Sequence, residues 1–358
     1  MNTLPHRFAH ILTLSLISGG LTISTSAPSH ASTLSDFLTK LISAPSYGPF
    51  PNLLDNQPTP TDTCNLIDRS NTETANGNNI GVRNYGCVIN NRNVVFSVSI
   101  PKLCETVSCG LIVDQHGATM NAEQENNGTH LREYGQQAMR YGASTPYIVI
   151  QPNMTDLIDQ VTNKVDLVSV MGLPYSNELP ALLAFVANAK TALHVDPKRV
   201  HFHGFSRGGF TASKVYCDPK TKGQFASMVG SGSFLGCAVD RPYMQFIGET
   251  DPNSLVAAGV AQRFHSSGAN REVIIQDANW QVPTLKFMAG KPTLVGKQQH
   301  LRYTLDGHVL ENVQHSGLAF PLAGHCLPYD GPAGWLVCPT NFDMGRKILN
   351  FFIQHPME

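Results

Sequence analysis

The segment G-F-S-R-G at residues 204–208 places a serine between two glycines, in the pattern G-x-S-x-G. An apolar run ends at His203 and a helical pattern begins at Gly208, so we expect a sharp strand-to-helix turn at Ser206. Such a turn lifts the hydroxyl to a helix N-terminus, where backbone amides favour developing negative charge. A passive serine in an ordinary turn is the alternative. The strand–turn–helix context favours Ser206 as a nucleophile.

A serine hydroxyl is a weak nucleophile and needs a base that takes its proton. Where a serine occupies this kind of turn, the chain order is serine, then acid, then histidine. His325 follows the last predicted strand by a loop and precedes the last predicted helix, so it is our candidate base. His315, at the end of that strand, is the alternative. The other downstream histidines lie in a helix pattern, in or beside strands, or at the C-terminus: His265, His300, His308 and His355.

The candidate acid is Asp251, in the segment G-E-T-D-P at residues 248–252, directly after an apolar strand pattern. A carboxylate there would accept from the histidine ring N–H, fix its tautomer and stabilise the imidazolium. The aspartate could instead cap the helix that follows Pro252. Glu249 is the nearest competing acid, and Asp277 and Asp306 are further possibilities.

An earlier apolar strand runs into His116-Gly117-Ala118. In this type of fold, a backbone N–H just past such a strand contributes to the oxyanion hole together with the residue after the nucleophile. We therefore assign the N–H groups of Ala118 and Arg207 as donors, each worth about 3 kcal/mol in the transition state. An ordinary turn, with His116 packed beneath the loop, is the alternative.

Residues 267–307 form a longer excursion than a minimal strand–helix unit needs, and its Trp280, Phe287 and Met288 could line a cleft or be buried. Trp335 lies in the loop between Cys326 and Cys338, close in sequence to His325. We assign three residues to a substrate cleft: Thr119, Trp280 and Trp335.

Apolar runs alternate with helical patterns from residue 94 onward, which is typical of a mostly parallel sheet flanked by helices. The predicted strands are 94–100, 111–114, 147–151, 199–203, 225–230, 243–247 and 309–314. The predicted helices are 130–141, 178–193, 208–217, 255–266 and 344–354. No large helical insertion separates these strands, so the pattern predicts one α/β domain over residues 94–358, of the α/β-hydrolase type, without a large cap domain.

The first 31 residues have a weakly basic start, an apolar run and a small-residue site at Ser29-His30-Ala31, as a secretory signal peptide does. The apolar run is too short and interrupted for a membrane anchor. Residues 32–93 begin with a stretch rich in Ser, Pro, Thr and Asn, and we expect an extended N-terminal arm there. We therefore expect an exported protein, extracellular or periplasmic, that acts as a monomer and does not bind a membrane.

Eight cysteines in an exported chain suggest disulfides. The sequential pairing, which closes four short loops, is our prediction: Cys64–Cys87, Cys104–Cys109, Cys217–Cys237 and Cys326–Cys338. A zinc site is disfavoured because no C-x-x-C pair occurs, and we expect no metal. The formal net charge of −1 and the lack of a Lys/Arg cluster argue against a nucleic-acid partner.

Four motifs together resemble the polyhydroxybutyrate depolymerase and feruloyl esterase group of α/β-hydrolases: H-G-A at 116–118, G-F-S-R-G-G at 204–209, E-T-D-P at 249–252 and G-H-C at 324–326. The resemblance covers residues 94–355. It implies extracellular hydrolysis of carboxylic esters, in polyesters or plant cell-wall material, with no cofactor. Ala118 and Phe205 stand where some relatives carry cysteines.

The expected function is that of a serine carboxylesterase that acts on a polyester (polyhydroxyalkanoate-like or aromatic) or on its oligomers through an acyl-enzyme at Ser206. A feruloyl or acetyl esterase acting on plant polysaccharide is the close alternative. A serine peptidase and a non-catalytic binding protein on the same fold are the alternatives from other classes.

Overall fold

The computed structural model describes residues 63–75, 78–89, 92–153, 158–159, 164–165, 178–251, 253–276, 298–317, 324–332, 334–340 and 342–358. The predicted signal peptide, residues 32–62 of the predicted arm, Trp280 and Asp277 lie outside these residues. No helix in the described part of the chain combines the length and the apolar character that crossing a bilayer requires.

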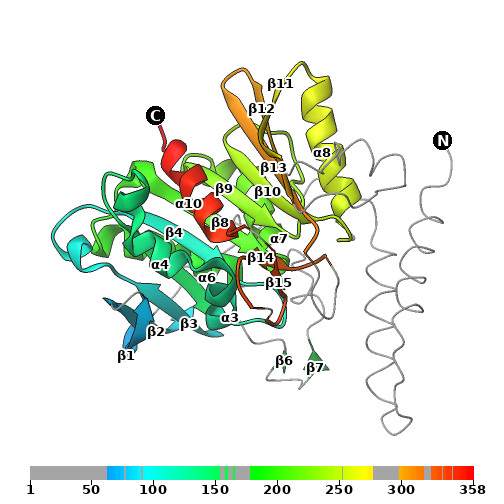
Figure 1. Cartoon of the computed structure of the whole chain (residues 1–358). Helices are drawn as coiled ribbons and strands as arrows, with labels where there is room; N and C mark the ends of the chain where they lie inside the picture. Colours follow the sequence, from blue (N-terminus) through cyan, green and yellow to red (C-terminus); the bar gives the residue numbers. More distant parts are fainter. Residues whose placement is uncertain are drawn as a thin grey trace, which may run out of the picture. The chain divides into compact units, whose positions relative to one another are not determined.

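An eleven-stranded sheet forms the centre of the described structure (Figure 1), in the order β1-β2-β3-β5-β4-β8-β9-β10-β13-β12-β11. Its strands are β1 (Thr63–Ala75), β2 (Asn78–Ile89), β3 (Arg92–Ser99), β4 (Gly110–Gln115), β5 (Tyr147–Asn153), β8 (Val200–Phe205), β9 (Ser227–Ser231), β10 (Tyr243–Gly248), β11 (Asn270–Gln276), β12 (Gln298–Leu305) and β13 (His308–His315). The six strands from β5 to β13 are parallel, and the outer strands on either side pair antiparallel.

The central strands are buried along their whole length, as parallel strands covered on both faces must be. All six residues of β4, of β8 and of β10 are buried. Successive residues point to opposite faces, so Val113 belongs to one apolar core and Ile112 to the other.

Helices cover both faces of the sheet. One core includes Leu182 of α6 (Glu178–Ala192), Val215 of α7 (Arg207–Cys217) and Ala261 of α8 (Ser254–Ser266). The other includes Leu131 of α4 (Leu131–Gln136) and Ile348 of α10 (Met344–Gln354), and α3 (Ala122–Thr129) contacts α10. Together with the strand order and the turn at Ser206 described below, this arrangement is the expected α/β-hydrolase fold.

Shorter elements complete the described structure. These are β6 (Ile158–Asp159) paired with β7 (Lys164–Val165), β14 (Leu327–Tyr329) paired with β15 (Val337–Pro339), and the 3-10 helices η1 (Lys102–Glu105), η2 (Ala138–Tyr141), η3 (Pro197–Arg199) and η4 (Pro219–Thr221).

Each of the seven predicted strands corresponds to a strand of the sheet, but the sheet begins earlier than predicted. Residue 94, the expected start of the α/β domain, lies inside β3, and β1 and β2 extend the same sheet. The later part of the expected arm is therefore part of the sheet. Similarly, the excursion at residues 267–307 contributes the antiparallel edge strands β11 and β12.

The helix predicted at 130–141 is divided. His130 has φ 49° and ends α3, which was not predicted, before α4 and η2 follow. A left-handed residue cannot continue an α-helix, so the chain turns there. Asn121 starts α3 with a capping box, in which its side chain accepts from the backbone of Gln124 and the Gln124 side chain accepts from Asn121 N–H.

All four predicted disulfides are present: Cys64–Cys87, Cys104–Cys109, Cys217–Cys237 and Cys326–Cys338. Cys64 and Cys87 are also directly opposite each other in the β1–β2 pair. The disulfide between them therefore fixes the register of the outermost two strands on that side of the sheet.

Candidate active site

The turn between β8 and α7 holds the candidate nucleophile in an unusual backbone conformation. Ser206 has φ 52° and ψ −113°, in a region that non-glycine residues rarely occupy. Its backbone N–H donates to the carbonyl of Ser231, at the end of the neighbouring strand β9, over 2.7 Å. Such strain persists only where the surroundings hold it, and it is common at functional sites.

The glycines of the G-x-S-x-G motif are required by close packing. A Cβ at Gly204 would lie 2.1 Å from the carbonyl oxygen of Gly208, and a Cβ at Gly208 would lie 2.1 Å from that of Gln115. Backbone cannot move aside for a methyl group at these distances. The turn is therefore pressed against the end of β4, where the predicted oxyanion loop begins.

Ser206, Asp251 and His325 form one hydrogen-bonded group. The Nδ1 atom of His325 lies 2.8 Å from Oδ2 of Asp251, and its Nε2 atom lies 2.8 Å from Oγ of Ser206. Because the carboxylate only accepts, Nδ1 carries the proton and Nε2 is left to accept from the serine hydroxyl. Asp251 and His325 are 2% and 7% exposed, while Ser206 is partly exposed, so the candidate nucleophile is the member of the group that a substrate could reach.

Burial and Asp251 act in opposite directions on His325. Burial lowers the pKa of the imidazole, but the charge and the hydrogen bond of Asp251 raise it more, so the pKa lies above its usual 6.5. This raises the basicity of the imidazole and stabilises the imidazolium that would form when it takes a proton.

Asp251 also serves the helix that follows it. Its Oδ1 atom accepts from the backbone N–H of Asn253 over 2.8 Å, and its carbonyl accepts from Ser254 N–H over 2.9 Å. The capping alternative and the acid hypothesis are therefore compatible, because each uses a different carboxylate oxygen. The bond to Asn253 fixes the carboxylate in the orientation that reaches His325.

The loop that carries His325 rests directly on the loop that carries Asp251. A Cβ at Gly248 would lie 1.9 Å from the carbonyl oxygen of Gly324, and a Cβ at Gly324 would lie 2.6 Å from Oγ1 of Thr250. The Cys326–Cys338 disulfide then holds the residue after His325, and β14 and β15 pair beside it. Glycines and a disulfide therefore position the imidazole on its acid.

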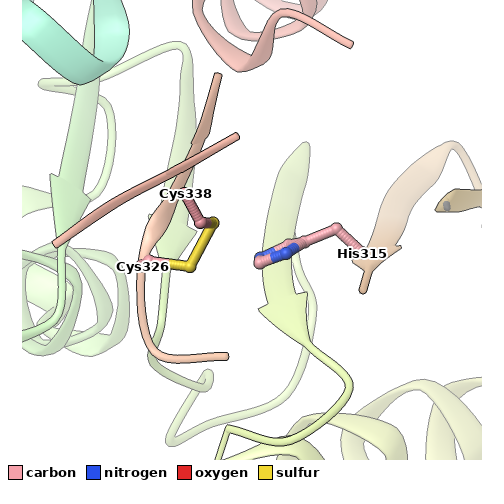
Figure 2. A group of neighbouring side chains, drawn as sticks. All are labelled: His315, Cys326 and Cys338. Carbon is pink, nitrogen blue, oxygen red and sulfur yellow. A yellow bond between two sulfur atoms is a disulfide. The ribbon is translucent and has the colours of Figure 1, made fainter. Parts of the chain in front are cut away.

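His315, the alternative base, occupies a different place. It is 1% exposed at the end of β13, and burial lowers its pKa to about 4, although Asp251 raises it. Figure 2 shows its ring directed toward the disulfide of Cys326 and Cys338. These three side chains lie close enough to hold a metal ion, but disulfide sulfurs are not thiolate ligands. Glu249, the competing acid, donates its backbone N–H to the His315 carbonyl.

The predicted oxyanion loop lies beside the nucleophile turn. A Cβ at Gly117 would lie 2.8 Å from the ring of Phe205, and that ring packs against His325 with 5.2 Å between centroids. His116 is buried and hydrogen-bonds through Nδ1 to the Gly117 carbonyl over 2.7 Å. Burial lowers its pKa to about 4, so it is neutral at pH 7. Ala118 is partly buried, and the assignment of its N–H and that of Arg207 as oxyanion donors remains a proposal.

Two of the three predicted cleft residues lie together. The Trp335 indole N–H donates to Oγ1 of Thr119 over 3.4 Å, and the Trp335 residue is 42% exposed. Thr119 is itself exposed, with φ 66°, directly after the predicted oxyanion donor. An exposed aromatic surface therefore borders the oxyanion loop.

A buried network of polar side chains on β4, α3 and β8 was not predicted from the sequence. Its centre is Asp114, Glu125 and His203, whose ligand-type atoms all lie within 4.8 Å of one another. The carboxylate of Asp114 accepts hydrogen bonds from Thr129, Gln151 and His203. The available signal was an aspartate and a histidine inside strand patterns that are otherwise apolar.

No family model and no curated protein matches this chain. Among solved structures, it is similar to a thermostable esterase (19% identity, TM-score 0.37), with 48% of each chain covered, so about half of that esterase is spanned. It is also similar to a poly(3-hydroxybutyrate) depolymerase from Bordetella parapertussis (14% identity, 53% of this chain and 80% of that chain, TM-score 0.38). A third is an acetyl xylan esterase from Aspergillus awamori (13% identity, 72% and 93%, TM-score 0.40). At TM-scores below 0.5 these similarities assign no activity to this chain.

Proposed function

We propose that this protein is a secreted serine carboxylesterase that uses Ser206, His325 and Asp251 as its catalytic residues. The observation that carries the proposal is the position of His325, which hydrogen-bonds to Ser206 and Asp251 through its two ring nitrogens. This is the arrangement that makes a serine hydroxyl nucleophilic at neutral pH.

In the proposed reaction, Oγ of Ser206 attacks the ester carbonyl carbon while Nε2 of His325 takes the hydroxyl proton. The resulting oxyanion accepts hydrogen bonds from the N–H groups of Ala118 and Arg207. His325 then gives its proton to the leaving alkoxide, and an acyl-enzyme remains. Water, deprotonated by His325, attacks the acyl group and releases the acid and the free serine.

We propose a polyester or its oligomers as the substrate, without a cofactor. The exposed face of Trp335, beside Thr119, supplies an apolar surface next to the oxyanion loop on which a repeating ester chain can lie. A feruloyl or acetyl esterase would use the same three catalytic residues and differ only in the substrate that binds to this surface.

Secretion is proposed on the N-terminal signal pattern and on the four disulfides, because disulfides persist in oxidising compartments. We propose that the enzyme acts as a monomer on its ester substrate.

The test is hydrolysis of a short-chain nitrophenyl ester by the purified protein and by Ser206→Ala. We expect turnover by the wild-type protein and a loss of about 10⁴-fold or more in the variant, with unchanged thermal unfolding. A fluorophosphonate should label Ser206 and abolish activity, whereas a chelator should have no effect. Ser213→Ala, on the following helix, is the matched control and should retain activity. More than a tenth of wild-type activity in Ser206→Ala would remove the serine mechanism.

The substrate class is tested by comparing release of acid from polyhydroxybutyrate film, an aromatic polyester and methyl ferulate. We expect the highest rate on one of the two polyesters or its oligomers. A preference for methyl ferulate, or for acetylated polysaccharide, would transfer the proposal to the plant-polysaccharide esterases. Cleavage of peptides without ester hydrolysis would favour the peptidase alternative.

A further inference from the structure

Directly beneath the nucleophile turn, three polar side chains on adjacent strands form a second hydrogen-bonded row. Nδ1 of His203 on β8 lies 2.7 Å from Oδ1 of Asp114 on β4, and its Nε2 lies 2.9 Å from Oγ of Ser231 on β9. These strands are neighbours in the sheet (Figure 1), and Asp114 and His203 are register partners. All three side chains are fully buried.

The order of atoms in this row repeats that of the candidate catalytic group. Asp114 accepts from Nδ1–H of His203, so Nε2 is the nitrogen left to accept from the Ser231 hydroxyl. Because none of the three is exposed, the row cannot reach a substrate. It can only act through the residues that it holds.

The row is connected both to the nucleophile turn and to the strand that leads into the oxyanion loop. Ser231 accepts the backbone N–H of Ser206 over 2.7 Å, so the position of its carbonyl sets that of the nucleophile. Asp114 is the second-last residue of β4, which leads into the oxyanion loop. The last residue of β4, Gln115, packs closely against the nucleophile turn, since a Cβ at Gly208 would lie 2.1 Å from its carbonyl oxygen. His203 therefore ties the strand that leads to the oxyanion loop to the strand that holds the Ser206 amide.

The far end of the row is fixed by further buried partners. Asp114 accepts from Thr129 Oγ1 over 3.0 Å and from Gln151 Nε2 over 2.6 Å. Gln151 in turn accepts from Arg132, which is fully buried and forms an ion pair with Glu123 over 2.9 Å. Burial and the charge of Asp114 raise the pKa of Glu125 well above its usual range, which favours the neutral form of this neighbour beside Asp114.

A metal ion is the competing interpretation of Asp114, Glu125 and His203. An ion there would have to displace the donors that already occupy the Asp114 oxygens and the Nδ1 proton of His203. The hydrogen bonds already satisfy the Asp114 carboxylate and both ring nitrogens of His203, whereas the two carboxyl oxygens of Glu125 have no hydrogen-bond partner in the described structure. The bonds of Asp114 and His203 therefore specify one geometry without an ion.

We propose that Asp114, His203 and Ser231 form a buried positioning relay that holds Ser206 and the oxyanion loop in register. The relay residues are positioning residues, and their contribution to turnover rests on the proposed esterase function. Their contribution to the position of the Ser206 amide does not depend on that function.

The chain contains a matched control pair. His201 lies on the same strand and the same face as His203, is equally buried, and has Nδ1 at 2.9 Å from Oγ of Ser227 on β9. In the described structure, Ser227 lies at the opposite end of β9 from Ser231, away from the nucleophile turn. Changes at His201 and Ser227 therefore remove a similar buried contact without touching the relay.

The experiment compares Ser231→Ala with Ser227→Ala, and His203→Phe with His201→Phe, at a temperature where all four variants are folded. Amide hydrogen exchange is followed in the peptide that contains Ser206, and kcat and KM are measured on a soluble nitrophenyl ester. We expect the relay variants to speed exchange of the Ser206 amide about fivefold. They should lower kcat about 10- to 100-fold with KM nearly unchanged. The control variants should match the wild-type protein in both measurements.

The alanine variants keep the test decisive if either phenylalanine variant fails to fold, because Ser231→Ala retains the carbonyl that accepts from Ser206. Equal exchange and equal kcat in Ser231→Ala and Ser227→Ala would overturn the relay. A wild-type protein without esterase activity would instead overturn the proposed function, while faster exchange in Ser231→Ala alone would still support the relay.

Discussion

The Nε2 atom of His325 lies 2.8 Å from Oγ of Ser206, although 119 residues separate the two in the sequence. Their contact depends on three loops that meet at the carboxyl end of the parallel strands, after β8, β10 and β13. The loop of Gly324 packs on Thr250, and the loop of Gly117 packs on Phe205. Loops at this edge of a parallel sheet are where α/β proteins place their sites.

His325→Ala should lower kcat/KM nearly as far as Ser206→Ala, because no other described group lies at hydrogen-bond distance of the Ser206 hydroxyl as a base. His315→Ala should retain most activity per folded molecule, since His315 faces the Cys326–Cys338 disulfide and the Ser206 hydroxyl is hydrogen-bonded to His325. The measurement is kcat/KM on a nitrophenyl ester, normalised to folded protein by circular dichroism. An inactive His315→Ala with an active His325→Ala would reverse the assignment of the base.

Asp251→Asn should reduce kcat by about 10⁴-fold, because the variant favours the wrong tautomer of His325. The amide N–H₂ would face Nδ1 of His325 as a donor and favour the tautomer that carries its proton on Nε2. Glu249→Gln is the matched control on the same loop, because the two ring nitrogens of His325 are engaged by Asp251 and Ser206. Comparable losses in the two variants would show that the loop, and not the carboxylate of Asp251, is what matters.

The central sheet could be predicted because its strands are continuous apolar runs between turn residues. The edge strands escaped prediction because they are rich in polar residues, and alternation alone does not separate them from loops; β1 reads TCNLIDRSNTETA. Helix α3 was hidden for a related reason. It buries Glu125 and Asn126, so its inward face looks polar in the sequence.

The candidate catalytic group could be predicted because each member carries a local signal: glycines around Ser206, an apolar strand before Asp251, and a glycine and a cysteine beside His325. The relay could not be predicted in this way. Asp114, His203 and Ser231 come from three strands, and only the register of β4, β8 and β9 shows that they meet. Pairing between distant strands is not encoded in any local pattern.

Trp335→Ala should raise KM for polymeric or oligomeric esters while leaving kcat for a short soluble ester within about twofold. The indole borders the oxyanion loop through Thr119 but lies outside the proton-transfer path. Exposed aromatic side chains contribute contact area to a bound chain, so the loss should grow with substrate length. Met139→Ala removes another exposed apolar side chain, in η2, and serves as the control. An equal effect of the two variants on oligomers would exclude a role for Trp335 in the cleft.

Removing the Cys326–Cys338 disulfide should affect both stability and turnover. Its residues are 12 apart, so the double change to alanine should cost about 3 kcal/mol of unfolding free energy in the chain-entropy model. Because Cys326 follows His325 directly, kcat should also fall about tenfold or more as the imidazole loses its position. The Cys104–Cys109 pair, with a separation of 5, should cost about 2 kcal/mol when changed to alanine, with kcat retained. Equal kcat values in the two double variants would show that the disulfide does not position His325.

The dependence of kcat/KM on pH should report the titration of His325 in the free enzyme. The imidazole must be neutral to accept the Ser206 proton, so kcat/KM falls as the pH drops through its pKa. Asp251 holds that pKa above 6.5, and the acid limb should therefore have its midpoint above pH 6.5. His315 should not contribute to this limb, since burial holds its pKa at about 4.

The variant Asp251→Asn tests whether Asp251 raises the pKa of His325, as this interpretation requires. The variant removes the negative charge that raises the pKa of His325 and leaves the burial that lowers it, so the residual activity should have its acid midpoint at lower pH than the wild-type enzyme. Profiles of kcat/KM from about pH 5 to about pH 9, with Glu249→Gln as the control that keeps the wild-type midpoint, make the comparison. An unchanged or higher midpoint in Asp251→Asn would mean that a group other than the Asp251-bound His325 controls the acid limb.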